Sequence, residues 1–418
     1  MLVYIHVPFC RTRCNYCAFH SSALGRGVEP AASPAVRDYV DTLFLEIARK
    51  ADRYAGEQVS SVFFGGGTPS LLPPRILGLI MERIARYFTL APRAEITLEA
   101  NPDSLQAAGT AADLLAAGIN RLSLGVQSLD DRLLRMLGRP HRAADAIRAY
   151  NFAREAGFAN VGVDLLWGLP EQGVRNWLEG LKEIVQLAPE HISAYNLTLE
   201  PGTALEEECR IGRLALPPER DQNIMFMEGS ALLESAGYLH YEISNFARMG
   251  FQCRHNTGYW EGAPYLGLGP SATSTIGERR FTNPASQREW SSLVQEDTEP
   301  AAEILSPEVR LLELIMLRLR TSRGLRLKAY RDLTGRDFTQ DHQRLIQALH
   351  ENGLIRIREG YMRLTRSGML VSNSILANIF EQTRSSLHRG DDALAKDAPG
   401  QTPAAGEQFV QPVVWPGA

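Results

Sequence analysis

Six short apolar runs, each followed by a segment with helical periodicity, make up the first half of the sequence. In chain order the runs are LVYIHV, VSSVFFGG, AEITLEAN, NRLSLGVQ, VGVDLLWG and HISAYNL. Strands that alternate with helices in this way are typical of a parallel sheet with helices outside it. Six units are too few to close a barrel of eight strands. We therefore predict an α/β fold with a partial (β/α)6 barrel of the TIM type, and a flat doubly wound sheet is the alternative.

Polar and flexible residues follow the carboxyl ends of these predicted strands. In a parallel barrel the residues that bind ligands gather at this end of the strands. One polar residue at the end of a strand is ordinary, but a full ring of them is not expected by chance. The sequence therefore predicts a functional site at this rim. The residues concerned are the segments 10–17 and 65–68, followed by Glu99, Gln127, Asp164 and Asn196.

The composition divides the chain into four parts, of which the barrel, residues 1–237, is the first. The segment 238–302 is irregular and aromatic and includes the polar stretch SSLVQEDTEPAAE, which favours a connecting region. Helical segments followed by the hairpin LIRIREGYMRLT predict a winged-helix-like C-terminal domain over residues 303–380. The last part, residues 381–418, is rich in Ala, Pro, Gly and Asp, and we expect a disordered tail there.

Charge and hydropathy exclude several classes of protein. The formal net charge of −4 excludes a globally basic nucleic-acid binder. Residues 306–380 carry 13 Arg and Lys against 7 Asp and Glu, but arginine is abundant throughout the chain, so nucleic acid is not an expected partner. The sequence has no uncharged apolar stretch of about 18 residues, and its start, MLVYIHVPFC, lacks a secretory signal. We therefore predict a cytoplasmic protein without a membrane span.

Three cysteines lie close together near the start of the chain, in CRTRCNYC. In a reducing compartment such a group more often holds a metal or takes part in catalysis than forms disulfides. Cys10, Cys14 and Cys17 could bind zinc tetrahedrally together with His20. The same three thiolates could instead hold a 4Fe-4S cluster, whose fourth iron stays open to another ligand. Because the loop follows the first strand and faces the predicted rim, we favour the cluster.

The C-x3-C-x2-C spacing, with Tyr16 before the last cysteine and Phe19 two residues after it, resembles the radical S-adenosylmethionine (SAM) superfamily. In that superfamily the open iron chelates SAM, and an electron from the cluster cleaves it to a radical. The resemblance implies a 4Fe-4S cluster on Cys10, Cys14 and Cys17. It also implies SAM binding at Tyr4, Tyr16, Gly66, Gly67, Thr68, Glu99, Gln127, Arg139 and Asp164.

The chemistry of several of these residues suits SAM. Glycines in GGGTPS let the backbone approach a ligand closely, and in the family this turn contacts the methionine moiety. The carboxylates of Glu99 and Asp164 can accept hydrogen bonds from the SAM amine or ribose, and Arg139 can pair with its carboxylate. The alternatives are that Glu99 caps the following helix and that Arg139 is a surface charge.

Within the superfamily the resemblance narrows to the oxygen-independent coproporphyrinogen III oxidase-like family and covers residues 2–380. The motifs that carry it are YIHVPFC, GGGTP, LEANP, GVQS, VDLLWGLP and the winged region. The chain departs from the coproporphyrinogen dehydrogenase at Phe19, where the enzyme has a further cysteine, and in the nine residues that precede Cys10, where the enzyme has a long segment. These departures weigh against radical decarboxylation.

The stretch CRHNTGYW resembles the haem-binding signature HNxxYW of the HemW haem chaperones, which look like the dehydrogenase. A neutral imidazole is a common axial ligand of haem iron, so we predict that His255 binds haem, with Tyr259 and Trp260 packed on the macrocycle. The alternative is a structural histidine. Cys253 is a second candidate ligand but is better explained as a small buried thiol, and Cys209 is given no role.

We therefore predict a haem chaperone of the HemW type, which binds haem and a SAM-coordinated cluster and delivers haem to haemoproteins. The first alternative is an oxygen-independent coproporphyrinogen III dehydrogenase of porphyrin biosynthesis, so the chain's status as an enzyme stays open. The second is a regulatory module whose winged domain contacts nucleic acid. The expected partners are haem, recipient haemoproteins and an electron donor for the cluster, and a homodimer is left open.

Overall fold

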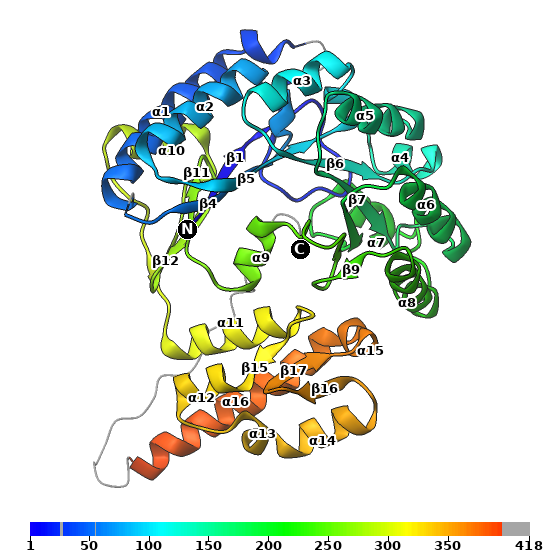
Figure 1. The fold of residues 1–418 in the computed structure, drawn as a ribbon, viewed down its shortest axis with the longest axis vertical. Coiled ribbons are helices and arrows are strands. Elements are labelled where there is room, and N and C mark those ends of the chain that lie inside the picture. The colour runs from blue at the N-terminus through cyan, green and yellow to red at the C-terminus, as the bar shows by residue number, and fades with distance from the viewer. Residues whose placement is uncertain (26–27, 55, 395–418) are drawn as a thin grey trace. The chain divides into compact units, whose positions relative to one another are not determined.

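The six predicted strand-helix units are present, and their strands form one parallel sheet in the order β1-β4-β5-β6-β7-β8 (Figure 1). The computed structural model describes residues 1–25, 28–54 and 56–394. The predicted α/β fold with a parallel sheet is confirmed. The strands are β1 (Leu2–Val7), β4 (Val59–Gly66), β5 (Leu90–Ala100), β6 (Arg121–Gln127), β7 (Val161–Trp167) and β8 (His191–Asn196).

Helices form an arc outside these strands (Figure 1). They are α1 (Pro34–Tyr54), α2 (Pro74–Tyr87), α3 (Ala108–Ala116), α5 (Ala143–Glu155), α6 (Val174–Leu187) and α8 (Glu219–Ser235). In α6, Trp177, Leu181 and Ile184 fall on one face because they are spaced by about one turn, and this face is buried. β1 is buried along its whole length, as expected for a parallel strand that is covered on both sides.

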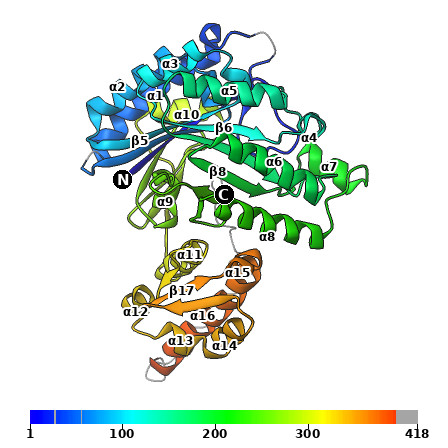
Figure 2. The same ribbon diagram turned by 45° about the vertical axis from the view of Figure 1, so that its right-hand side comes forward.

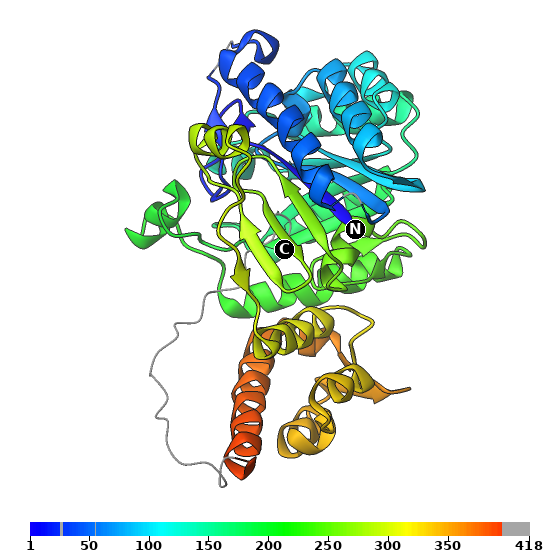
Figure 3. The ribbon, with the colours of Figure 1, turned by 90° about the vertical axis from the view of Figure 1, so that its left-hand side faces the viewer.

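The sheet continues beyond the six strands on both edges. β11 (Tyr265–Leu268) runs parallel to β1, and β12 (Thr273–Ile276), β13 (Arg279–Thr282) and β14 (Glu303–Ile304) follow it antiparallel (Figure 3, yellow-green). On the other edge, β10 (Asn245–Ala247) and β9 (Leu239–His240) follow β8. The helices of this region are α9 (Arg254–Trp260) and α10 (Gln287–Gln295). The segment 238–302 therefore contributes five short strands to the sheet, β9 to β13, and periodicity gave no sign of such short strands.

Short elements shape the loops at the carboxyl ends of the parallel strands. β2 (Phe9–Cys10) and β3 (Ser22–Ala23) pair with each other on either side of the cysteine loop. The other elements in these loops are three short 3-10 helices, η1 (Pro30–Ala32), η2 (Pro69–Leu71) and η3 (Pro102–Ser104), and the helices α4 (Asp131–Met136) and α7 (Ala204–Arg210). At the start of α4, the Asp130 carboxylate accepts hydrogen bonds from the backbone amides of Arg132 and Leu133 and so caps the helix.

The chain divides into two compact units. The first comprises Met1–His240 and Ser244–Leu305, and the second comprises Tyr241–Ile243 together with the chain from Ser306 onward. In the second unit, a sheet of order β15-β17-β16 is packed with helices (Figure 2). Its elements are α11 (Pro307–Leu319), β15 (Leu325–Arg326), α12 (Leu327–Thr334), α13 (Phe338–Asp341), α14 (Gln343–Glu351), β16 (Ile355–Arg358), β17 (Tyr361–Leu364), α15 (Arg366–Leu370) and α16 (Ser372–Leu394).

The hairpin predicted in the second unit forms, with β16 paired to β17 through a turn at Glu359 and Gly360. Both turn residues have positive φ, 55° and 77°, as a two-residue hairpin turn of type I′ requires. The tail predicted for residues 381–418 lies outside the described residues from 395 onward, whereas α16 is helical as far as Leu394. Over the described part of the chain, no helix has both the length and the hydropathy needed to cross a membrane.

Gly66 at the end of β4 should not tolerate a side chain. Its φ of 109° is strained for other residues, and a Cβ there would lie 2.7 Å from the His6 ring. We expect Gly66→Ala to lower the free energy of unfolding by at least about 2 kcal/mol, measured by urea denaturation. The matched control is Gly109→Ala on α3, where a Cβ meets nothing within 4 Å. Equal stability losses in the two variants would contradict this explanation.

Candidate functional site

The cysteine loop is fixed by hydrogen bonds to two helices. The backbone amide of Asn15 donates to Leu137 O (2.9 Å), and its side-chain Nδ2 donates to Met136 O (2.8 Å) at the end of α4. At the start of α7, the amide of Leu205 donates to Asn15 O (2.8 Å). Asn15 directly follows Cys14, so these bonds set the position of the central cysteine. The sequence motif drew attention to the cysteines and not to Asn15.

The three thiols are half-buried and are not in disulfides. Thr68 Oγ1 donates to Cys10 Sγ (3.6 Å), and Arg139 Nη1 donates to Cys14 Sγ (3.5 Å). Burial, with a smaller contribution from the neighbouring sulfurs, raises the pKa of Cys17 to about 11. Cys17 therefore carries its proton as the loop stands, and metal binding would release it.

The donor set of this loop fits an iron-sulfur cluster. It supplies three cysteine sulfurs and leaves a fourth position open. Within the described residues, no three Cys, His, Asp or Glu side chains are grouped to hold a metal ion as they stand, so the thiols would have to turn toward one point. His20, considered for zinc, has its ring 6.2 Å from that of His6, and its carbonyl oxygen lies 2.9 Å from His6 Nε2.

Arg139 and Asn101 link several strand ends beside this loop. Arg139 Nη2 donates to Asn101 Oδ1 (2.6 Å) and to Gly125 O (2.7 Å), and Asn101 Nδ2 donates to Thr68 Oγ1 (3.1 Å). Arg139 is therefore not a surface charge. Its Nε is buried and has no hydrogen-bond partner among the described residues, which leaves a donor suited to an anionic group such as the SAM carboxylate. Asn101 was not predicted, and its only signal is a polar residue after a strand and before a proline.

Glu99 on β5 and Asp164 on β7 lie on the two sides of β6 and have different partners. Glu99 Oε2 accepts from the amide of Gly66 (3.2 Å), so this carboxyl contacts the glycine run rather than capping the following helix. Asp164 accepts from Ser123 Oγ (2.9 Å) and Ser193 Oγ (2.6 Å). Burial, and then the charge of Asp164, raises the pKa of Glu99 to about 8. At neutral pH the Glu99 carboxyl therefore carries a proton.

The raised pKa of Glu99 predicts a direction for stability against pH. The group titrates near 4.5 when unperturbed and near 8 in the folded chain, so the folded state holds an extra proton between these values. This contribution to stability is complete below pH 4.5 and is lost as the pH rises through 8. We expect Glu99→Gln to show a smaller fall in unfolding free energy than the wild type between about pH 5 and about pH 8.5, measured by urea denaturation.

The control for this pH experiment is Glu82→Gln, at an exposed position on α2, which should keep the wild-type decline. Buried histidines contribute in the opposite direction, but they are common to all three proteins and cancel in the comparison. Parallel curves for the wild type and Glu99→Gln would contradict the assigned protonation.

Gln127 ends β6 in the left-handed region, with φ 67°. A Cβ added to Gly125 would lie between 3.1 and 3.3 Å from Gln127 Nε2, Asn101 Oδ1 and Arg139 Nη2. Three polar groups therefore meet over a glycine that makes room for them. Gly125 was also missed by sequence reasoning, although it stands in the GVQS motif.

The glycine run at the end of β4 contacts the cysteine loop itself. The amide of Gly67 donates to Val7 O (2.8 Å), and that of Thr68 donates to Phe9 O (2.7 Å). A Cβ on Gly67 would lie 2.5 Å from Phe9 O and 3.0 Å from Cys10 Sγ. The absence of side chains here thus lets two loops close on each other, next to the first cysteine.

The two tyrosines of the predicted SAM set lie in different surroundings. Tyr4 is 5% exposed in the middle of β1; its hydroxyl lies 3.2 Å from His6 Nδ1, and its ring centroid lies 6.4 Å from that of His255. Tyr16 lies in the cysteine loop and packs against a cluster of leucines. The cluster comprises Leu133, Leu137, Leu166, Leu169, Leu197 and Leu205.

The HNxxYW residues form helix α9, which contacts β4. His255 is only 1% exposed. Its Nδ1 lies 2.8 Å from Ser61 Oγ and its Nε2 lies 3.0 Å from the Tyr259 hydroxyl. Burial lowers the pKa of His255 to about 3, so the imidazole is neutral, the form that binds iron. As it stands the ring has the contacts of a structural histidine, and haem iron could reach it only if one contact opened.

Glu95 of β5 fixes the start of α9. Its Oε1 accepts from the amides of Arg254 (2.9 Å) and His255 (3.2 Å) and from Cys253 Sγ (3.5 Å). Burial raises the pKa of Cys253 to about 12, so its sulfur is a buried thiol rather than a thiolate ligand. Trp260 is also buried, at 6% exposed, and the described surface does not present it to a macrocycle.

His255 and the residues at the carboxyl ends of the strands lie at different levels of the parallel sheet, with Tyr4 on the level between them. Gly66 and Glu99 lie at the carboxyl ends, which we call the rim. Ser61 and its cross-strand partner Glu95, which hold α9, lie five and four residues earlier on the same strands, at a level that we call the floor. Ser61 and Gly66 are five residues apart on β4, which corresponds to about 17 Å. His255 therefore belongs to the floor and not to the ring of rim residues.

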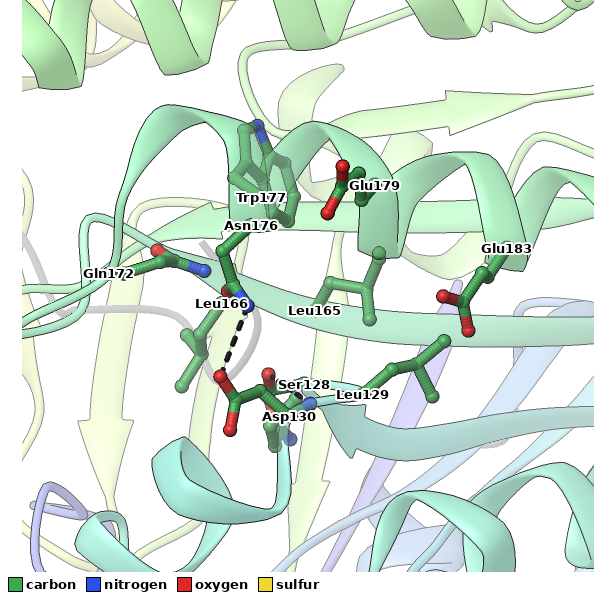
Figure 4. Close-up of a pocket in the computed structure, with 12 residues that line it drawn as sticks. Ser128, Leu129, Asp130, Leu165, Leu166, Gln172, Asn176, Trp177, Glu179 and Glu183 are labelled. Carbon is green, nitrogen blue, oxygen red and sulfur yellow. Dashed lines mark hydrogen bonds between the residues drawn. The ribbon is translucent and has the colours of Figure 1, made fainter.

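A small pocket of about 100 Å³ opens beside the rim, between the loop after β6 and helix α6 (Figure 4). Asn176 Nδ2 donates to Asp130 Oδ2 (3.1 Å) across it, and Glu179 and Glu183 line it from α6. Of the predicted site residues, only Gln127 lines this pocket. The cysteines and His255 are not part of it.

Comparison with known families gives two matches along the chain. The radical SAM superfamily profile matches residues 4–184, and the HemN C-terminal domain profile matches residues 305–371. The solved structure of coproporphyrinogen III oxidase (HemN) from Escherichia coli is similar, with a TM-score of 0.76 and 26% identity, over 91% of this chain and 89% of that chain.

Curated relatives are similar over most of the sequence. The chain is 40% identical to the haem chaperone HemW of Synechocystis, over 77% of this chain and 78% of the relative. It is 33% identical to HemW of Bacillus subtilis, over 89% of this chain and 97% of the relative. It is 44% identical to the mouse mitochondrial radical S-adenosyl methionine domain-containing protein 1, over 65% of this chain and 59% of that protein.

Proposed function

This chain belongs to the HemW haem chaperone family within the radical SAM superfamily, and we propose that it binds haem and delivers it to haemoproteins. Its relatives from Synechocystis and Bacillus subtilis bear the name haem chaperone. The observation that supports the haem step in this chain is His255, a neutral imidazole on α9 whose two nitrogens face different partners. The ring is held at the floor by Ser61 and Tyr259; of the residues proposed to bind SAM, Tyr4 lies beside it, with ring centroids 6.4 Å apart.

At the rim, Cys10, Cys14 and Cys17 would hold three irons of a 4Fe-4S cluster, which when bound supplies an electron to SAM. Glu99 would accept a hydrogen bond from SAM once its proton is lost, and Arg139 would donate to the SAM carboxylate through its buried Nε. The other proposed contacts are Tyr4, Tyr16, Gly66, Gly67, Thr68, Gln127 and Asp164. The Asp164 carboxylate already accepts hydrogen bonds from two serines. We therefore expect it to hold these strands in position rather than to bind a charged group of SAM.

The experiment that tests the proposal is an anaerobic haem titration of the full chain after cluster reconstitution. We expect one saturable Soret transition per chain. A titration that does not saturate, or whose absorbance equals that of free haem, would contradict haem binding. Iron and sulfide analysis of the same sample reports the cluster independently.

A coproporphyrinogen III dehydrogenase is the second candidate, because the fold resembles E. coli coproporphyrinogen III oxidase. The residue at the position of that enzyme's further cysteine is Phe19, which is 40% exposed here. We expect no protoporphyrinogen IX from coproporphyrinogen III under anaerobic, reducing conditions. Product formation at a rate that depends on SAM would favour the enzyme over the chaperone.

The remaining proposals concern the setting in which the chain works. We place it in the cytoplasm, with an electron donor for the cluster and haemoproteins as recipients of haem. A homodimer is a further possibility for its assembly. Size-exclusion chromatography with light scattering, with and without the cluster, would decide between monomer and dimer.

A further inference from the structure

The two ring nitrogens of His255 are engaged on opposite sides. Nδ1 lies 2.8 Å from Ser61 Oγ, and Nε2 lies 3.0 Å from the Tyr259 hydroxyl. An imidazole binds iron through the lone pair of one nitrogen, and its other nitrogen then carries a proton. Haem ligation therefore has to replace one of these two contacts and keep the other.

The two contacts differ in their access to solvent. Ser61 is 0% exposed and lies within β4, which is paired with β1 on one side and β5 on the other. Tyr259 lies on the surface helix α9 and is partly exposed. Of the two partners only Tyr259 is partly exposed, so Nε2 is the nitrogen on the solvent side, whereas Nδ1 faces Ser61 in the interior of the sheet.

The helix itself is fixed, so the change must be made by a side chain. Glu95 accepts from two amides at the start of α9, including that of His255. Near the end of the helix, Gly258 packs so closely on β1 that a Cβ would lie 2.7 Å from Leu2 Cδ1. Opening of the contact between Tyr259 and Nε2 would therefore have to come from the Tyr259 side chain and not from this backbone.

We propose that Tyr259 gates haem ligation by occupying Nε2 of His255 until haem displaces it, and that Ser61 then accepts the Nδ1–H hydrogen bond and orients the ring toward the iron. This inference rests on the proposed haem function and adds Ser61 as a positioning residue outside the HNxxYW motif. In metal sites, the hydrogen bond on the second nitrogen of a histidine fixes its tautomer and orientation. Ser61 has the distance and the burial for that role.

The test uses the full chain, with haemin as the probe, in the variants Ser61→Ala, Ser61→Thr, Tyr259→Phe and His255→Ala. We expect Ser61→Ala to weaken haem affinity about 10–100-fold and to shift the ferrous iron-histidine stretching band in resonance Raman spectra. Ser61→Thr keeps the hydroxyl and should restore both. Tyr259→Phe loses one hydrogen bond and should bind haem about fivefold faster in stopped-flow mixing.

Tyr265→Phe is the matched control for the gate. Tyr265 packs edge-on against Tyr259, with ring centroids 4.9 Å apart, and its hydroxyl accepts from Thr275 Oγ1 (2.7 Å). This variant should bind haem at the wild-type rate. The proposed gate would be wrong if Tyr259→Phe binds haem no faster than the wild type, or with an affinity that is several-fold lower.

The outcomes separate this inference from the function on which it rests. If His255→Ala loses the iron-histidine band but Ser61→Ala keeps the wild-type affinity and band, the role of Ser61 is wrong and the proposed function stands. If wild-type protein shows no saturable haem binding, both fall. If Ser61→Ala does not fold, Ser61→Thr and Tyr259→Phe still decide the two parts.

Discussion

Cys14→Ala is expected to abolish the iron-sulfur cluster and to leave haem binding unchanged. Two thiolates on a short loop cannot hold a cluster that needs three protein ligands. Cys14 is the central cysteine, its sulfur accepts from Arg139 Nη1, and its position is set by the bonds of Asn15 to α4 and α7. Haem binding should persist because His255 lies at a different level of the parallel sheet. Iron and sulfide analysis with visible absorbance after anaerobic reconstitution measures the first effect, and haem titration the second.

The matched control for this prediction is Cys209→Ala. Cys209 is half-buried on α7, so its replacement by alanine removes a thiol of similar exposure outside the cysteine loop. It should retain the full iron and sulfide content of the wild type. A full cluster in Cys14→Ala would show that the loop is not the metal site, and one zinc ion per chain in the wild type would favour the tetrahedral alternative.

His255→Ala should have the opposite pattern, with haem affinity reduced at least about a hundredfold and the cluster intact. The reason is loss of the imidazole that α9 holds between Ser61 and Tyr259. Removal of a fully buried ring also costs stability, so binding should be measured well below the unfolding transition. Haemin titration of the reconstituted variant gives the affinity.

His350→Ala provides the matched control for that experiment, because His350 is exposed on α14 in the second unit. It should bind haem like the wild type. Wild-type affinity in His255→Ala would mean that the histidine is structural. Joint loss of haem and cluster would mean that the variant had lost the fold of the first unit.

The parallel sheet could be predicted because its signal is local. Each of the six strands is an apolar run whose neighbours in the sheet are set by the strand-helix order, and β1 is buried over its full length. β11 could not be predicted in this way, because its four residues carry no usable periodicity and it pairs with β1 from far along the chain. The boundary of the first unit consequently extends beyond the predicted barrel.

The sequence indicates which side chains are candidates for the sites, but it does not indicate which residues contact them. The cysteines, Glu99 and Arg139 stand in short motifs, and motifs identify donors and charges. The partners of His255 come from elsewhere: Ser61 is 194 residues away and Glu95 is 160 residues away in the sequence. Only the folded chain shows that the imidazole is enclosed by them, and that Asn101 links Thr68 to Arg139.

The placement of α9 at the floor bears on whether a SAM-derived radical could attack haem bound to His255. A deoxyadenosyl radical attacks hydrogens only within about 3.5 Å of it. A porphyrin carried on His255 would lie at the floor, whereas such a radical would form at the rim. The interior side chains of the sheet, among them Tyr4 and Phe63, stand between them. If both proposals hold, buried side chains of the sheet would separate the reactive cofactor from the haem carried by the same protein.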